Sequence, residues 1–332
     1  MEFGITFKGD IGLERTVALC KQAEVAGFDY AWFFDSHVLW AECYTTMAVC
    51  MRETQRLRYG PCVTNPGVRD WTVAASTFAQ LANISDNRYD LGVGRGDSSL
   101  RMLGRKPFTV KSTVDFMYLI KKMARGETVH IHGRDLEFTW AKPETEIPCW
   151  FAAYGPMALK AAGEHADGII LQLADPWLID WFASQSRQAA KEAGRDPASL
   201  RVMSAAPVWV GDIEKARQQT RWFPAMVGNH VADIVSKYGS GSSNVPQRLT
   251  DYIEGRKGYD YKQHADKDAD HLDFISNDII DSFSILGPVE EHVKKLKELE
   301  AAGVTQFNIY LMCGEEERLV AEYANHVLPH FR

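Results

Sequence analysis

Four short apolar segments of this chain each end in residues that could bind a ligand or move a proton. They are Asp35 and His37 after Tyr30–Phe34, Asn65 after Arg58–Thr64, Gly94, Gly96 and Asp97 after Tyr89–Val93, and Tyr154, Gly155, Pro156 and Met157 after Cys149–Ala153. A buried parallel strand has a short continuous apolar sequence. Active sites of α/β proteins lie beyond the carboxyl ends of such strands. The pattern therefore predicts one site built from these strand ends.

Asp35 and His37 suit binding or proton transfer, because imidazole titrates near neutral pH and a neighbouring carboxylate can share its proton. The alternative is that Asp35 or Ser36 caps the following helix and that His37 has no role. Asn65 can offer its amide to the polar edge of a ligand. It precedes Pro66, however, and Asn-Pro also starts turns.

Gly94 and Gly96 allow the backbone to turn tightly and a flat ligand to lie against the main chain. Asp97 either faces that ligand or caps the next helix. Gly155 and Pro156 begin a helix whose free N–H groups and positive dipole end attract phosphate. The same pair is also an ordinary helix start, so both interpretations stay open.

The elements that position these residues are indicated by a repeated junction, in which a helical stretch ends in Gly and a strand follows. Ala26-Gly27 leads into Tyr30–Phe34, Asp167-Gly168 into Ile169–Leu171, and Ala302-Gly303 into Gln306–Met312. Gly favours helix C-termini because it accepts a left-handed backbone. Repeated helix–Gly–strand units predict an α/β fold with a parallel sheet.

Eight strands with mostly helical connections favour a closed barrel, in which the last strand pairs with the first. The expected strands are Phe3–Phe7, Tyr30–Phe34, Arg58–Thr64, Tyr89–Val93, Cys149–Ala153, Ile169–Leu173, Val202–Val210 and Gln306–Met312. We therefore predict a single (β/α)8 TIM-barrel domain over residues 1–332, with an excursion at about 126–147 and an insertion at about 224–283. No Gly-rich dinucleotide fingerprint follows the first strand, which argues against a Rossmann fold.

Composition narrows the classes of function. The formal net charge is -7 and no basic stripe is present, so nucleic acid is not an expected partner. No apolar run approaches the ~20 residues of a membrane span, and no signal peptide is evident, so we expect no membrane association and a cytoplasmic location. None of the six cysteines forms a CxxC pair, and no cluster of metal ligands recurs at several strand ends. Buried free thiols and no metal centre are expected.

The ordered set of strand-end motifs resembles the bacterial luciferase-like oxidoreductase superfamily. The segments that carry the resemblance are Gly27–His37, Thr64-Asn65-Pro66, Asn87–Asp97, Leu103–Pro107 and Ile285–Glu291. Ala152–Pro156 followed by Ala161–Gly168 resembles the deazaflavin branch, which uses coenzyme F-420 (F420) and includes methylenetetrahydromethanopterin reductase. One departure is that the branch commonly has Asp directly before His, whereas Ser36 stands between Asp35 and His37.

The resemblance implies a luciferase-like oxidoreductase that transfers hydride between F420 and a small organic substrate. It implies that the backbone of Gly155–Met157 holds the cofactor phosphate and that Cys62–Val63 is a cis peptide behind the cofactor ring. It implies that His37, Asn65 and Asp97 border the ring or the substrate, with His37 as a proton donor. A homodimer is also expected.

Two alternatives stay open. One is a luciferase-like monooxygenase that binds FMN, uses O2 and receives reduced flavin from a partner reductase. The other is a non-catalytic flavin-binding homologue.

Overall fold

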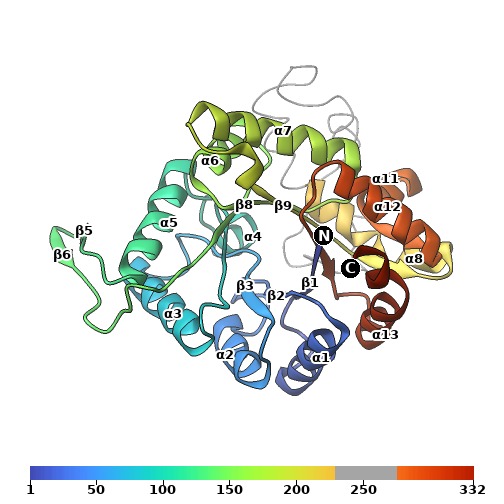
Figure 1. Cartoon of the computed structure of the whole chain (residues 1–332), viewed down its shortest axis with the longest axis horizontal. Helices are drawn as coiled ribbons and strands as arrows, with labels where there is room; N and C mark the ends of the chain where they lie inside the picture. The colour runs from blue at the N-terminus through green and yellow to red at the C-terminus, as the bar shows by residue number, and fades with distance from the viewer. Residues whose placement is uncertain (229–274) are drawn as a thin grey trace.

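The computed structural model describes residues 1–228 and 275–332. The strands form the inside of a ring and the helices its outside (Figure 1). The barrel strands are β1 (Glu2–Phe7), β2 (Tyr30–Phe33), β3 (Arg58–Pro61), β4 (Leu91–Val93), β7 (Cys149–Ala152), β8 (Gly168–Leu171), β9 (Arg201–Ala206) and β12 (Gln306–Tyr310). The helices are α1 (Leu13–Ala26), α2 (Cys43–Glu53), α3 (Trp71–Ile84), α4 (Asp97–Met102), α5 (Val110–Ala124), α6 (Pro156–His165), α7 (Pro176–Glu192), α8 (Ile213–Thr220), α11 (Asn277–Phe283), α12 (Val289–Ala301) and α13 (Glu316–Glu322).

The barrel sheet has eight strands in the order β3-β2-β1-β12-β9-β8-β7-β4. The last barrel strand pairs with the first in parallel, as predicted. Between β3 and β4 the pairing is reduced to two parallel bridges, Tyr59 with Tyr89 and Thr64 with Val93. These bridges close the ring, so the prediction of a luciferase-like TIM barrel is confirmed.

The junction glycines have two different reasons to be glycine. Gly27 ends α1 at a φ of 89° and Gly303 follows α12 at a φ of 95°, as expected of left-handed helix ends. Gly168 is instead the first residue of β8, and the backbone before it at Ala166 is extended. A Cβ at Gly168 would collide with the Trp150 ring. The prediction of a helix-ending glycine was therefore wrong at this junction. Glycine is needed here because close packing leaves no room for a side chain.

The predicted strand Val202–Val210 is two strands. Pro207 has no N–H to donate to a sheet ladder, and it separates β9 from β10 (Val208–Val210). β10 leaves the barrel and pairs in parallel with β11 (Ile285–Gly287), which was not predicted.

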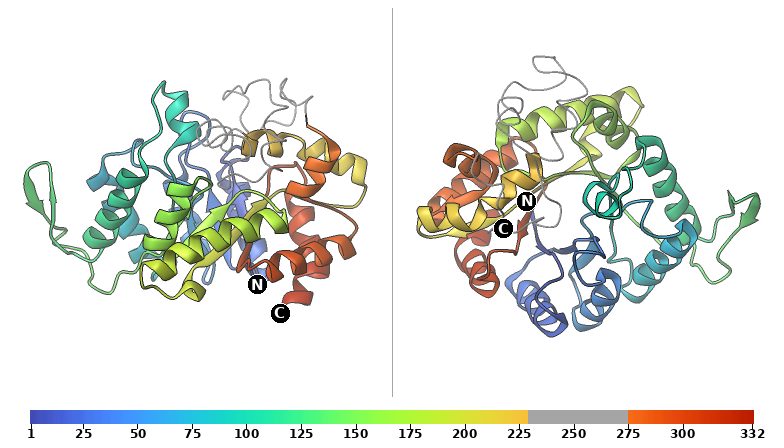
Figure 2. Two further views of the ribbon diagram at one scale, coloured as in Figure 1. Left: turned by 90° about the horizontal axis from the view of Figure 1, so that it is seen from above. Right: turned by 180° about the vertical axis from the view of Figure 1, so that it is seen from behind.

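The excursion contains an antiparallel hairpin of β5 (Val129–Ile131) and β6 (Arg134–Leu136), which stands away from the ring (Figure 2). Its turn residues His132 and Gly133 have φ values of 54° and 72°. Of the predicted insertion, residues 229–274 lie outside the described residues, and α11 is a regular helix within the remainder. The division into one domain with these two additions stays a prediction.

Aromatic side chains fill the barrel below its mouth. Trp32 stacks on Tyr30 with ring centroids 5.5 Å apart, and Trp150 meets Trp32 edge-on at 6.0 Å. Because this interior is packed, a ligand can enter only at the mouth. All six cysteines are free and buried, as predicted. In the described parts of the chain, no helix is both long and apolar enough to cross a membrane.

Candidate active site

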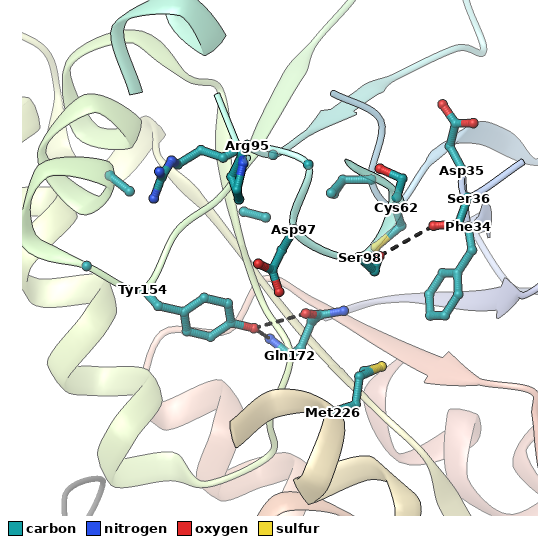
Figure 3. Close-up of a pocket in the computed structure, with 18 of the residues that line it drawn as sticks. Phe34, Asp35, Ser36, Cys62, Arg95, Asp97, Ser98, Tyr154, Gln172 and Met226 are labelled. Carbon is teal, nitrogen blue, oxygen red and sulfur yellow. Dashed lines mark hydrogen bonds between the residues drawn. The ribbon is translucent and has the colours of Figure 1, made fainter. Parts of the chain in front are cut away.

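A cavity of about 550 Å³ opens at the carboxyl ends of the barrel strands (Figure 3). The segments that follow β2, β3, β4, β7 and β8 all contribute to its walls. Apolar walls with a few convergent polar groups are typical of a small-molecule site. Nine of the twelve predicted site residues line it, namely Asp35, Cys62, Val63, Gly94, Gly96, Asp97, Tyr154, Gly155 and Met157, whereas His37, Asn65 and Pro156 do not.

Asp35 braces the mouth of the barrel. One of its oxygens, Oδ2, accepts hydrogen bonds from the Tyr44 hydroxyl (2.9 Å), the Thr64 hydroxyl (2.6 Å) and Arg69 Nη1 (2.6 Å). Its side chain is 2% exposed. These contacts tie the end of β2 to the segment after β3. Neither Asp35 nor Ser36 caps α2, because Glu42 does, and the catalytic role of Asp35 stays a prediction.

The residue after Asp35, rather than His37, faces the cavity. Ser36 lines it, with its Oγ 3.4 Å from the Ser98 Oγ. His37 is exposed and is not among the residues that line the cavity. Trp40, three residues after His37, also lines the cavity. The predicted proton-donor role of His37 therefore stays a prediction, and Ser36 joins Asp35 as a polar residue of the cavity wall at this strand end.

The floor of the cavity is formed where β3 and β4 end. The Cys62–Val63 peptide is cis, as the resemblance implied. A Cβ at Gly94 would lie 2.9 Å from Val63 Cγ2 and 3.6 Å from the Ala152 Cβ. Any side chain at position 94 would therefore crowd Val63 and fill part of the floor. Burial raises the pKa of the Cys62 thiol to about 12, so this thiol is neutral at pH 7.

Asn65 acts behind the wall rather than in the cavity. Its Nδ2 donates to the Ser99 Oγ at 2.8 Å, and its Oδ1 accepts from the Gly67 N–H at 3.0 Å. Gly96 packs against it at a φ of 86°, where a Cβ would lie 2.7 Å from the Asn65 Cγ. Asn65 thus fixes both its own turn and the turn after β4, as the alternative interpretation of Asn-Pro anticipated.

Asp97 is the first residue of α4 and does not cap it, since Gly96 occupies the N-cap position. Arg101 Nε donates to the Asp97 carboxylate at 2.6 Å. The carboxylate points toward the cavity, on the side of Tyr154 and Gln172 (Figure 3). Asp97 therefore places a charge-assisted acceptor in the site.

The start of α6 forms the opposite wall. Gly155 occupies the N-cap position with no side-chain cap, and Pro156 is the first helical residue. The N–H groups of Ala158 and Leu159 donate to the Gly155 carbonyl, so the helix is wound from its first turn. Pro156 fixes the backbone without reaching the cavity. The positive end of the helix dipole is therefore directed at a wall of the cavity.

Several cavity residues were not among the predicted site residues, and Arg95, Gln172 and Met226 are three of them. Arg95 lies between two glycines that were identified, and its Nε donates to the Phe108 carbonyl at 2.6 Å. Gln172 and Met226 also line the cavity. Gln172 carried a signal, because it is a polar residue within the apolar run Ile169–Leu173. In the described residues, no group of three or more His, Cys, Asp or Glu side chains could hold a metal ion.

Comparisons with known proteins agree with this geometry. The family model for luciferase-like monooxygenases matches residues 1–306. A 5,10-methylenetetrahydromethanopterin reductase from Methanopyrus kandleri is 27% identical, over 100% of this chain and 99% of that protein. The solved structure of the coenzyme F420-dependent tetrahydromethanopterin reductase from the same organism has a TM-score of 0.80 at 23% identity and covers 100% of this chain and 99% of its own. A long-chain alkane monooxygenase has a TM-score of 0.72 at 13% identity and covers 100% of this chain and 91% of its own.

The chain belongs to the luciferase-like monooxygenase family, and it is an oxidoreductase of that family. The resemblance drawn from its strand-end motifs is confirmed.

Proposed function

We propose that this protein binds the deazaflavin coenzyme F420 in the cavity at the barrel mouth and transfers hydride between it and a small organic substrate. The observation that carries the proposal is the cavity itself. It joins the start of α6, which can hold a phosphate, to a floor at Val63 and Gly94 that no side chain at position 94 obstructs. Relatives that are named as F420-dependent dehydrogenases, and a solved reductase that is named as F420-dependent, favour a deazaflavin over FMN.

The residues present fit a flat heterocycle with an anionic tail. Gly94 leaves the space that a Cβ would occupy beside Val63. The backbone of Gly155–Met157 and the guanidinium of Arg95 would hold the phosphate-bearing tail, since the helix dipole and the cation both favour negative charge. A bound reduced deazaflavin supplies a hydride, which carries two electrons to the substrate.

The protein's own contribution is orientation, water exclusion and proton supply. Phe34, Trp40 and Met226 give the cavity apolar walls. Asp97 and Ser36 are the polar groups placed to orient the substrate. His37 is the candidate proton donor, and it follows β2 as Ser36 does. Excluding water strengthens each of these polar contacts. A homodimer and a cytoplasmic location belong to the same proposal.

Titration of the purified protein with F420 and, separately, with FMN tests the cofactor. Trp40 lies in the cavity wall, so tryptophan fluorescence should fall as the site fills. We expect F420 to bind at least tenfold more tightly than FMN. A Trp40→Phe variant should show a smaller fluorescence change at a similar dissociation constant, which would locate the signal in the cavity.

Two results would contradict the proposal. Preferential binding of FMN would favour the two-component monooxygenase, and a search for a reductase partner would follow. Binding of neither cofactor would remove the site assignment altogether.

A further inference from the structure

Gln172 is the polar residue that directly follows β8 and lines the cavity. Its neighbours Leu171 and Leu173 are both 0% exposed, whereas Gln172 is partly exposed and lines the cavity. An amide in this position needs hydrogen-bond partners, because an unsatisfied polar group in a largely apolar wall is destabilising.

The oxygen of this amide is fixed by Tyr154. The backbone N–H of Gln172 donates to the Tyr154 hydroxyl at 2.7 Å, so the hydroxyl proton must point away from that N–H. That proton is donated to the Gln172 Oε1 at 3.3 Å. Figure 3 shows the amide oxygen turned toward Tyr154 and the amide nitrogen turned away from it. The orientation of the amide therefore follows from the direction of two hydrogen bonds.

The nitrogen of the amide is fixed by Tyr310. Gln172 Nε2 donates one hydrogen to the Tyr310 hydroxyl at 2.7 Å, and Tyr310 is 0% exposed. An amide nitrogen carries two hydrogens. In the described part of the chain, the hydrogen bonds of Nε2 account for only the first. The second is held beside the cavity by a side chain that two tyrosines prevent from rotating.

The two tyrosines connect the parts of the cavity that the proposed function assigns to the cofactor. Tyr154 immediately precedes Gly155 at the start of α6. Tyr310 interacts with the Cys62 thiol, beside the Cys62–Val63 peptide. Gln172 lies between these two ends. The substrate-facing polar groups Asp97 and Ser36 come from other strand ends.

We infer that Gln172 donates its second Nε2 hydrogen to an acceptor on the edge of the cofactor heterocycle, and that Tyr154 and Tyr310 position this amide. The inference rests on the proposed function. It makes Gln172 a cofactor-orienting residue that discriminates between ring edges carrying an acceptor and ring edges carrying a donor. Tyr154 then contributes through its hydroxyl contact with Gln172 rather than through a contact with the phosphate.

Binding of F420 by the purified protein and its variants provides the test, with fluorescence quenching for affinity and the long-wavelength absorption band for the ring environment. Gln172→Glu keeps the shape of the side chain and can accept from both tyrosine hydroxyls, but it donates nothing when ionised. We expect it to weaken F420 binding about tenfold or more and to remove the absorption shift that we expect when the unmodified protein binds F420. Gln172→Met should weaken binding similarly.

A pair of tyrosine variants separates positioning from packing. Tyr310→Phe removes the hydrogen-bond partner of Gln172 Nε2. It should weaken F420 binding several-fold and should not increase the absorption shift on binding. Tyr323→Phe is the matched control, because Tyr323 is also 0% exposed and its hydroxyl makes one comparable hydrogen bond, to His292 Nδ1 at 2.8 Å, outside the cavity. It should bind F420 as the unmodified protein does.

The outcomes distinguish this inference from the proposed function. If the unmodified protein binds F420 and both Gln172 variants bind it equally well with an unchanged absorption band, the amide is only a packing group and the inference is wrong. If the unmodified protein binds no F420, the proposed function fails instead. Equal weakening by Tyr310→Phe and Tyr323→Phe would show a general loss of packing and would also overturn the positioning role.

Discussion

The Asp35–Arg69 pair offers a quantitative test of what holds the mouth of the barrel in place. Arg69 Nη1 lies 2.6 Å from Asp35 Oδ2, and the two side chains are 19% and 2% exposed. The perturbation is a double-mutant cycle of Asp35→Asn, Arg69→Met and the combined variant. Each single change removes one charge of a pair that is mostly shielded from solvent.

The structure sets the expected magnitudes. Arg69→Met leaves the Asp35 carboxylate buried with only the Tyr44 and Thr64 hydroxyls as donors, and removing one partner of a buried pair costs about 3 kcal/mol of the free energy of unfolding. Asp35→Asn should cost about 2 kcal/mol. It costs less because Arg69 retains Glu42 Oε1 at 3.1 Å and some contact with water. The combined variant should lose about 2 kcal/mol less than the sum of the two.

Chemical denaturation followed by circular dichroism measures these differences. For a chain of 332 residues, 3 kcal/mol corresponds to a fall of about 4 °C in Tm, which is also measurable. An exposed pair serves as the control. Lys111 and Asp115 on α5 are 84% and 47% exposed, and the cycle of Lys111→Met with Asp115→Asn should show no resolvable coupling. Additive effects of Asp35→Asn and Arg69→Met would refute the brace.

Three further predictions concern pH, the phosphate end and the strand end after β2. His292 donates from Nε2 to the Trp209 carbonyl (3.1 Å) and accepts from the Tyr323 hydroxyl at Nδ1 (2.8 Å), and burial lowers its pKa from 6.5 to about 4. As pH falls below 6.5, the unfolded chain gains a proton that the folded chain does not accept until about pH 4. The free energy of unfolding should therefore fall by about 3 kcal/mol over that pH range. Denaturation curves should show a weaker pH dependence for His292→Gln. Gly155→Asp places a negative charge at the start of α6 and should weaken F420 binding by tenfold or more without lowering Tm; unchanged affinity would remove the phosphate site from α6. His37→Ala should lower the rate of F420 turnover. It should leave Tm unchanged, because the side chain is exposed. An unchanged rate would contradict the proton-donor role of His37 and leave Ser36 as the candidate at this strand end.

Regular elements were the part of the fold most readable from the sequence. Helices α1 and α12 were predicted with their observed ends, because each combines a helical apolar face with a glycine that stops it. The barrel strands other than β9 were placed to within three residues, because parallel strands buried on both faces have continuous apolar sequences. The break at Pro207 was missed, since a proline that ends a strand and a proline at its edge look alike in sequence.

The cavity was predictable as a place but not as a set of side chains. All four polar strand ends do converge, because the carboxyl ends of parallel strands meet at one edge of the barrel. Residue type gave no information about direction, however. Ser36 faces the cavity and His37 does not. The side-chain amide of Asn65 is occupied by hydrogen bonds to its own turn and to the Ser99 hydroxyl.

By itself, the sequence determined the ring of strands and helices, the family and the end of the barrel that carries the site, because these depend on apolar periodicity and on motif order. Tertiary structure alone decided which groups act there. The carboxylate of Asp35 braces the barrel mouth because Thr64 and Arg69, which follow another strand, donate hydrogen bonds to it. The amide of Gln172 became a fixed donor only when Tyr154 and Tyr310 met it from two sides. A side chain's direction after a strand depends on backbone turns and on partners distant in the chain, and no local pattern of residue types records either.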